Sequence, residues 1–203
     1  MKSKYIIRKN QPKQLRDKML IVCTGQTEEI YFNFIKNKYK NSLLKITIDV
    51  ITHKRNTPMT IVKRAIENIN DYKEVWVVFD RDEALDFDEA VRSSYLHGIK
   101  CAFSNRQIEY WFLLHFVYTT ADMNREKLES ELNRYLKFKY DKDETTLNKV
   151  YSKIFKNLSL AEIRAKEGFI KQKAVHKSKP SDWCSCTTVY QLTETMKKWN
   201  EAK

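Results

Sequence analysis

The sequence predicts an α/β protein with a mostly parallel central sheet of about four strands, flanking helices and a helical C-terminal appendage. Strand-like and helix-like segments alternate from residue 19 onward. The run Val75–Phe79 is apolar throughout, as expected of a central strand that is covered on both faces. Glycine and proline are scarce, at 3 residues each, which favours long regular elements over a loop-rich β-sandwich.

The first half of the chain contains three of the expected strands. The apolar run Met19–Cys23 predicts a strand, and the following pattern predicts a helix from about residue 28 to residue 39. A second strand is expected within residues 43–51, where apolar residues alternate with polar ones. Thr57 and Pro58 are typical of a helix start, with a capping threonine before proline at the first helical position.

The second half of the core continues the alternation. A helix over residues 88–96 is closed by Gly98, and a fourth strand is expected over residues 99–103. The next helix, residues 108–118, is apolar around its circumference and is therefore expected to be largely buried. Strands separated by helices imply right-handed crossovers and a parallel sheet.

After residue 118 the chain becomes basic and helical. Three amphipathic helices are expected over residues 124–138, 145–158 and 159–175, followed by a helix within 186–199 that returns to the sheet. Basic side chains here, including Arg125 and Lys142, could line a groove for a nucleic-acid backbone. Aromatic residues such as Tyr140 could stack on bases, although we favour a buried face for most of them.

This pattern divides the chain into three predicted parts, which are a basic N-terminal arm (1–18), an α/β core (19–118) and a basic helical region that packs back on the core (119–203). The arm could touch phosphates, but a solvated terminus is the commoner explanation of such a composition.

The charge balance indicates a polyanionic partner. The chain of 203 residues carries 38 Lys and Arg against 26 Asp and Glu, a net charge of +12, and nucleic acid is the leading partner of so basic a protein. No apolar run approaches the roughly 20 residues that span a bilayer, and no secretory signal core is recognisable at the N-terminus. We therefore expect a cytoplasmic protein without a membrane partner.

The cysteines are also consistent with a reducing cytoplasm. Cys23 and Cys101 lie in strand-like runs and are expected to be buried thiols, and the four cysteines do not suggest a disulfide framework. His176, Cys184 and Cys186 could suggest zinc, but a C-x-C motif without a second pair is a weak signal.

Carboxylates follow two of the predicted strands. Asp80 and Asp82 come directly after the third strand, and Glu28 stands at the mouth of the helix that follows the first. In open parallel sheets ligands bind at the carboxyl ends of the strands. Oxygen ligands at such a point suit Mg²⁺ or Mn²⁺. The alternative is a purely structural role, in which both aspartates only form a turn and cap the next helix.

Three motifs carry a resemblance to a known family. The stretches "IVCTGQTEEIYF", "VWVVFDRDE" and "AFSNRQIEYWFLLHF", in this order and spacing, resemble the RloB-like proteins, which are Toprim-domain proteins of bacterial phage-defence and restriction-associated loci. The resemblance runs from about residue 19 to residue 115, with weaker support from "CTTVYQL" near the end. It implies a Toprim-like fold for the core.

The resemblance also implies a metal-dependent site. Toprim domains use a glutamate after the first strand and a D-x-D motif to hold Mg²⁺, which here implies Glu28, Asp80 and Asp82 as metal-binding and catalytic residues. The first-strand motif departs from the family pattern, because Thr24 stands where a first glutamate is usual, beside Gly25. A threonine hydroxyl has no useful base strength near neutral pH. Three outcomes stay open: Glu28 takes over the acid role, the nuclease is slow, or the protein is a binding module.

Other residues near the strand ends are candidates for binding phosphate, and for some of them a purely structural role is equally consistent with the sequence. Ser104 and Asn105 follow the fourth strand and could orient a phosphate or a metal-bound water, or could form a helix-capping turn. Arg81 and Arg106 are candidates for steadying phosphate charge.

Two residues of the apolar helix expected over residues 108–118 are predicted to have a supporting role next to the site. Glu109 lies in a very apolar helix and needs a partner such as an arginine or a metal ion. His115 is more often a core histidine than a ligand.

The expected activity is a Mg²⁺- or Mn²⁺-dependent hydrolysis of phosphodiesters in RNA, tRNA included, or in DNA. By resemblance, the setting is anti-phage defence with an ATPase partner protein; oligomerisation stays open. Whether the chain is an enzyme also stays open, since a catalytically degenerate Toprim-derived module that binds nucleic acid or nucleotide is the alternative. A third alternative is a response-regulator-like switch, in which one strand-end acid accepts phosphate.

Overall fold

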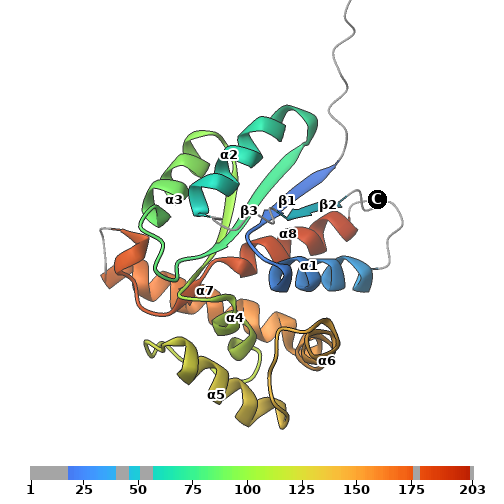
Figure 1. The fold of residues 1–203 in the computed structure, drawn as a ribbon, viewed down its shortest axis with the longest axis vertical. Coiled ribbons are helices and arrows are strands. Elements are labelled where there is room, and N and C mark those ends of the chain that lie inside the picture. Colours follow the sequence, from blue (N-terminus) through green and yellow to red (C-terminus); the bar gives the residue numbers. More distant parts are fainter. Residues whose placement is uncertain (1–17, 40–45, 51–56, 176–178, 202–203) are drawn as a thin grey trace, which may run out of the picture.

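One five-stranded sheet organises the chain (Figure 1). The computed structural model describes residues 18–39, 46–50, 57–175 and 179–201. The strands lie in the order β2-β1-β3-β4-β5; the first four are parallel, and β5 pairs with β4 in the antiparallel sense. The strands are β1 (Met19–Cys23), β2 (Ile46–Val50), β3 (Glu74–Asp80), β4 (Lys100–Asn105) and β5 (Cys186–Thr187). The predicted α/β fold with a mostly parallel sheet is confirmed.

Eight α-helices surround the sheet in the described part of the chain. They are α1 (Gln26–Lys38), α2 (Pro58–Asn68), α3 (Phe87–Leu96), α4 (Ile108–Leu114), α5 (Arg125–Leu136), α6 (Glu144–Ile154), α7 (Leu158–Val175) and α8 (Val189–Glu201). Short 3₁₀ turns are η1 (Ile69–Asp71), η2 (Phe155–Asn157) and η3 (Pro180–Asp182). No helix in these ranges has the length and apolar character that a bilayer crossing requires.

Alternate side chains of the strands build two cores, one on each face of the sheet. Val77 and Phe79 of β3 pack with residues of α2 and α3, whereas Trp76 and Val78 of the same strand pack with residues of α1, α4 and α8. This two-sided burial explains why β3 is apolar throughout, because both faces of a central strand are covered. Figure 1 shows α2 and α3 on one side of the sheet and α1 and α8 on the other.

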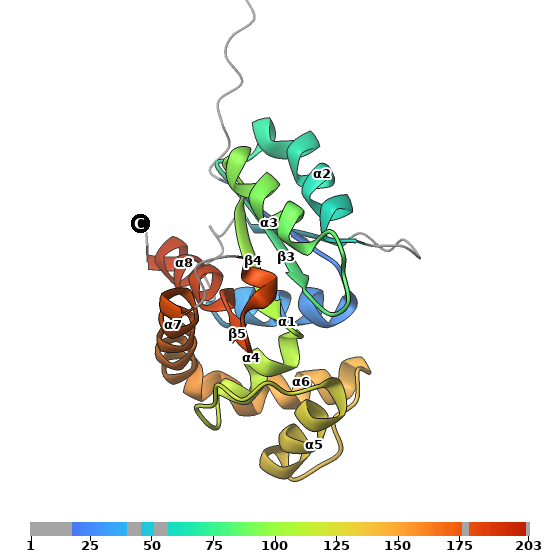
Figure 2. The ribbon, with the colours of Figure 1, turned by 90° about the vertical axis from the view of Figure 1, so that its left-hand side faces the viewer.

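The basic helices extend the second core away from the sheet. α4 is buried along all seven of its residues, and it contacts α5 and α7, while α6 packs against α1. Figures 1 and 2 show α5 and α6 at the end of the molecule opposite α2 and α3. The long segment α4–α7 therefore stands at the carboxyl ends of the parallel strands and can bring side chains to them.

Local signals explain most element starts. Thr57 accepts a hydrogen bond from the backbone N–H of Thr60 ahead of Pro58, as predicted. Asn124 and Asp143 cap α5 and α6 in the same way, through bonds from Lys127 and Thr146. Gly98 closes the turn after α3 with φ of 70°, a conformation that glycine adopts without steric cost.

Some expected boundaries differ from the observed ones. The fourth strand runs to Asn105, so Ser104 and Asn105 belong to β4 and do not follow it as predicted. Ser104 pairs with Asp80 of β3 and with Thr187 of β5, and Asn105 pairs with Cys186 of β5. The sequence pattern does not predict β5, so it places the end of the fourth strand too early. The apolar helix ends at Leu114, whereas residue 118 was predicted. The basic arm, except Lys18, and the ends of the predicted second strand lie outside the described residues.

Candidate active site

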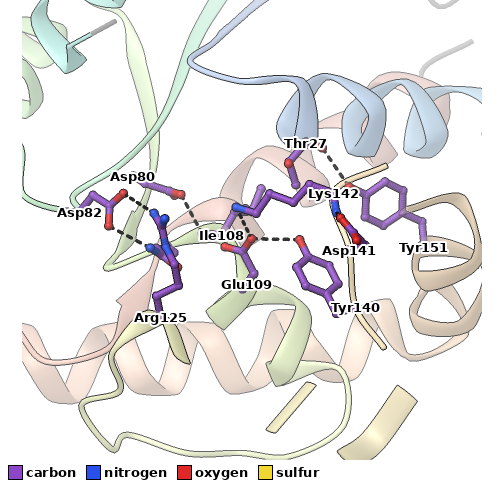
Figure 3. Close-up of polar contacts among 11 residues, drawn as sticks. Thr27, Asp80, Asp82, Ile108, Glu109, Arg125, Tyr140, Asp141, Lys142 and Tyr151 are labelled. Carbon is purple, nitrogen blue, oxygen red and sulfur yellow. Dashed lines mark hydrogen bonds and ion pairs between the residues drawn. The ribbon is translucent and has the colours of Figure 1, made fainter. Parts of the chain in front are cut away.

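Three parallel strands end side by side at the candidate site. In the ladder register, Cys23 of β1 pairs with Val78 of β3, and Asp80 of β3 pairs with Ser104 of β4. The residues that follow β1 and end β3 therefore share one edge of the sheet, as expected for a parallel ladder. Helix α4 begins at the same edge, and Figure 3 shows Asp80 and Glu109 within this region.

Asp80 is anchored by the start of α4. Its Oδ2 atom accepts a hydrogen bond of 3.0 Å from the backbone N–H of Ile108, a partner at the positive end of a helix. Burial nevertheless raises the pKa of Asp80 well above its usual range, and the charges of Glu28 and Glu109 raise it further. The three carboxyl groups are therefore close enough to disfavour one another's ionised forms.

Glu28 is the second member of this cluster. It is 5% exposed, and burial raises its pKa to about 7, with a further contribution from Glu109. A hydrogen bond from Thr24 and the charge of Lys142 act in the opposite direction. A β-carbon at Gly25 would lie 2.8 Å from Oε2 of Glu28, so glycine is the residue that leaves room for this carboxyl group.

Glu109 is the third member and the most deeply buried. It is 1% exposed, and its Oε1 atom accepts hydrogen bonds from the hydroxyl of Tyr140 at 2.9 Å and from Nζ of Lys142 at 2.8 Å (Figure 3). Its Oε2 atom is buried and has no hydrogen-bond partner among the described residues. A buried carboxylate oxygen without a partner is costly, and it suits a cation or a bound water.

Asp82 has polar partners of its own, and its charge also raises the pKa of Asp80. Its Oδ1 accepts a hydrogen bond of 2.9 Å from Gln107, and its Oδ2 pairs with Arg125 at 3.0 Å (Figure 3). The backbone of Asp82 has φ of 40°, and the side chain is 52% exposed. The two aspartates of the D-x-D motif therefore have different surroundings, one partly buried beside α4 and one at the surface beside α5.

An open pocket of about 510 Å³ lies beside Asp82. It is lined by Asp82, Glu83, Arg106, Gln107, Asn124, Arg125 and Glu126. Arg106 forms a two-bonded pair with Asp122, at 3.1 and 2.8 Å. Both arginines of the pocket are thus paired with aspartates, Arg106 with Asp122 and Arg125 with Asp82, and a phosphate group would have to compete with these carboxylates for them.

Ser104 and Asn105, which were predicted to orient a phosphate or a metal-bound water, form hydrogen bonds with other parts of the chain. Ser104 bonds the hydroxyl of Thr187 at 3.0 Å. Asn105 donates to the carbonyls of Pro180 and Trp183, and its Oδ1 accepts a bond from Arg81 at 3.3 Å. These bonds tie the end of β4 to the segment that carries η3 and β5, so in this structure both β4 residues hold chain segments together.

His115 lies in the core away from the carboxylates. It is 1% exposed, its Nδ1 bonds the carbonyl of Trp111, and its ring packs edge-on against the Trp111 ring. Burial lowers the pKa of His115 to about 4, so the ring is neutral at pH 7.

Cys184 and Cys186 are free thiols, and His176, the third residue of the weak zinc hypothesis, lies outside the described residues.

Among the residues that the structure describes, no three or more His, Cys, Asp or Glu side chains are arranged as a ready metal site. The cluster nevertheless fits a divalent cation by its chemistry. Glu28, Asp80 and Glu109 gather hard oxygen donors, and the orphaned Oε2 of Glu109 provides an unpaired acceptor inside it. Lys142 stands in this cluster as the present source of positive charge.

The sequence patterns do not assign Tyr140, Lys142, Arg125 or Gln107 to this site. Arg125 and Lys142 are expected only in a general nucleic-acid groove, and Tyr140 as a stacking or core residue. Their contacts with Glu109 and Asp82 join residues that are 25 to 43 positions apart, and no local pattern indicates such distant pairs. The one available signal was the need of Glu109, in an apolar helix, for a buried partner.

A comparison with protein-family models decides the family. The model of the RloB-like proteins matches residues 19–196. The chain belongs to the RloB-like protein family. The match includes the sheet, the carboxylate cluster, helix α5 with Arg125 and the segment between α5 and α6 with Lys142. Neither the curated proteins nor the solved structures contain a match to this chain.

Proposed function

We propose that this RloB-like protein is a nuclease that hydrolyses phosphodiesters in RNA or DNA with the help of Mg²⁺ or Mn²⁺. The observation that carries the proposal is the cluster of buried Glu28 and Glu109 with partly buried Asp80 at the carboxyl edge of the sheet, in a chain of net charge +12. Mutual repulsion of buried carboxylates is costly unless a cation joins them. A basic surface around such acids suits a polyanionic substrate.

Different side chains would bind the metal ion, bind the phosphate and transfer the proton. Glu28 and Asp80 would hold the metal ion, with Asp82 as a further ligand once it leaves Arg125. A bound ion supplies polarisation of a phosphoryl oxygen and activation of water. Arg106 and Arg125, on the pocket beside Asp82, would bind the phosphate. Alternatively, Glu28 would move a proton and not hold the ion, a role that its raised pKa of about 7 suits near neutral pH.

The rival proposal is a catalytically degenerate module that binds nucleic acid or nucleotide. It is favoured by Thr24, which donates a hydrogen bond to Glu28 where the family resemblance places a glutamate. The biological setting of anti-phage defence in the cytoplasm, with an ATPase partner that triggers the protein, extends both proposals and rests on the resemblance.

The test is a cleavage assay with tRNA, single-stranded DNA and plasmid in Mg²⁺ or Mn²⁺, with and without the ATPase partner. We expect metal-dependent cutting that Asp80→Asn reduces at least about 100-fold. The control Glu89→Gln removes an exposed carboxylate of α3 and should leave cutting unchanged. Cutting that survives in Asp80→Asn would contradict the proposed nuclease.

Two further results would support the rival. One is binding of these nucleic acids without cutting, even when the ATPase and its trigger are present. The other is a large gain of cutting in Thr24→Glu, which would show that the natural site is impaired.

A further inference from the structure

The segment between α5 and α6 reaches into the carboxylate cluster. Tyr140 and Lys142 both bond Oε1 of Glu109, at 2.9 and 2.8 Å. The segment leaves α5 at Lys137, which has φ of 64°, and it ends where Asp143 caps α6. In Figure 3 the Lys142 side chain extends from this segment across to Glu109.

Lys142 brings a positive charge to the carboxylate cluster. Its Nζ atom pairs directly with Oε1 of Glu109 at 2.8 Å, and its charge also acts on Glu28 and Asp80. Arg125 carries the same charge as Lys142 and repels it, but Arg125 is itself paired with Asp82.

We propose that the Lys142 ammonium group is a tethered cation that occupies the carboxylate cluster when metal is absent, and that a divalent ion and Lys142 compete for Glu28, Asp80 and Glu109. The inference rests on the proposed function for the identity of the competing ion. It assigns to Glu109 a part in cation binding and to Lys142 control of the affinity for metal.

The two sides of the ion pair differ in their freedom to move. The Lys142 side chain is 49% exposed, whereas that of Glu109 is 1% exposed. A lysine side chain is a compact charge on a flexible four-carbon stem, so it can swing into solvent while the carboxylate stays in place. Displacement would expose the Glu109 oxygens, one of which already lacks a partner among the described residues.

This competition also accounts for the lack of a ready metal site in the described residues. With Lys142 present, Glu109 is turned to the ammonium group and the Tyr140 hydroxyl. A divalent ion carries twice the charge of the lysine and would therefore draw the three carboxylates of the cluster closer to one point.

The experiment compares Mn²⁺ binding to the full chain and to Lys142→Met, by titration calorimetry and by electron paramagnetic resonance of free Mn²⁺. Removing the competing charge should tighten Mn²⁺ binding at least about tenfold. Lys142→Arg, which keeps a charge, should return the affinity towards that of the unmodified protein. The matched control is Lys139→Met, which removes an exposed lysine of the same segment and should leave the affinity within about twofold.

A melting curve provides a second readout that needs no activity. Without metal, Lys142→Met should melt lower than the unmodified protein, because the Glu109 carboxylate loses its counter-charge. Mn²⁺ should then raise its melting temperature more than it raises that of the unmodified protein. Equal or weaker Mn²⁺ binding by a folded Lys142→Met protein would overturn the inference and leave the proposed function standing. Absence of Mn²⁺ binding in both proteins would overturn both.

Discussion

At the scale of the residue, the site depends on which carboxyl groups are buried together. The D-x-D spacing predicts that Asp80 and Asp82 act as a pair of metal ligands, and this stays a prediction. In the structure Asp82 bonds Gln107 and Arg125, while its charge still raises the pKa of Asp80. Glu109 also acts on Asp80, because the start of α4 contacts the end of β3. The buried strand and its final aspartate are predictable from the sequence pattern, whereas the contribution of Glu109 depends on the tertiary fold.

Gly25 gives a residue-scale prediction about this geometry. A methyl group there would lie 2.8 Å from Oε2 of Glu28, and Gly25 has extended φ and ψ of −145° and 168°, which alanine also adopts. We expect Gly25→Ala to cost less than about 1 kcal/mol of folding free energy, because a side-chain end can shift. It should weaken Mn²⁺ binding at least about tenfold by displacing Glu28.

The check is Mn²⁺ titration beside urea unfolding. Gly168→Ala is the control, because a methyl group at Gly168 meets only the Tyr110 hydroxyl at an ordinary 3.8 Å. Unchanged Mn²⁺ binding in Gly25→Ala would show that Glu28 does not need this space.

His115 gives a prediction about pH. Its pKa is about 4 in the folded protein, against 6.5 as the usual value, so the unfolded chain takes up a proton at a higher pH than the folded one. Stability is therefore fully present above pH 6.5 and is lost as the pH falls towards 4, by up to about 3 kcal/mol. His115→Gln should remove this part of the pH dependence.

Urea unfolding at pH 7 and at pH 5 provides the measurement. His97→Gln, at an exposed histidine after α3, is the control and should keep the full pH dependence. An equal loss of stability between these pH values in His115→Gln and the unmodified protein would refute the assignment.

At the scale of the element, the sequence patterns located strands and helices better than their ends. Residues 19–23 were predicted as a strand and Pro58 as a helix start, and both are confirmed. The two-residue strand β5 was missed because its two residues carry no repeating pattern, and it exists through bonds to a strand more than 80 positions away. Such short strands follow from tertiary contacts.

The junction of β4, β5 and α8 gives the prediction at this scale. The Thr188 hydroxyl accepts a bond of 2.9 Å from the N–H of Phe103 and donates to the carbonyl of Cys101 at 3.2 Å. Thr188→Val keeps the shape of the side chain but removes the hydroxyl that accepts the bond from the buried Phe103 N–H. We expect a loss of about 1–3 kcal/mol in the free energy of unfolding.

Urea unfolding measures this loss. Thr195→Val is the control, because its hydroxyl donates only to the Gln191 carbonyl within α8, and it should cost less than about 1 kcal/mol. Equal losses in the two variants would contradict a special role for the junction.

At the scale of the whole molecule, α5 and α6 stand at one end, near the carboxylate edge of the sheet, and α2 and α3 stand at the opposite end (Figure 1). The composition gives the net charge of the chain, whereas only the fold shows which basic side chains lie beside the acids. Arg125 reaches the pocket beside Asp82 from α5. We therefore expect nucleic acid to approach from the α5 side, with the pocket arginines on its phosphates.

Salt dependence tests that direction of approach. For binding of a labelled RNA or DNA duplex in the presence of Ca²⁺, the logarithm of affinity should fall with the logarithm of salt concentration, with a slope of about −3 or steeper. Arg125→Gln should reduce the steepness by about one, because one phosphate contact is lost. Lys63→Gln on α2, exposed at the far end of the molecule, removes the same charge and should leave the slope unchanged. If both variants lower the slope equally, the net charge alone attracts the nucleic acid and the pocket beside Asp82 is not where its phosphates bind.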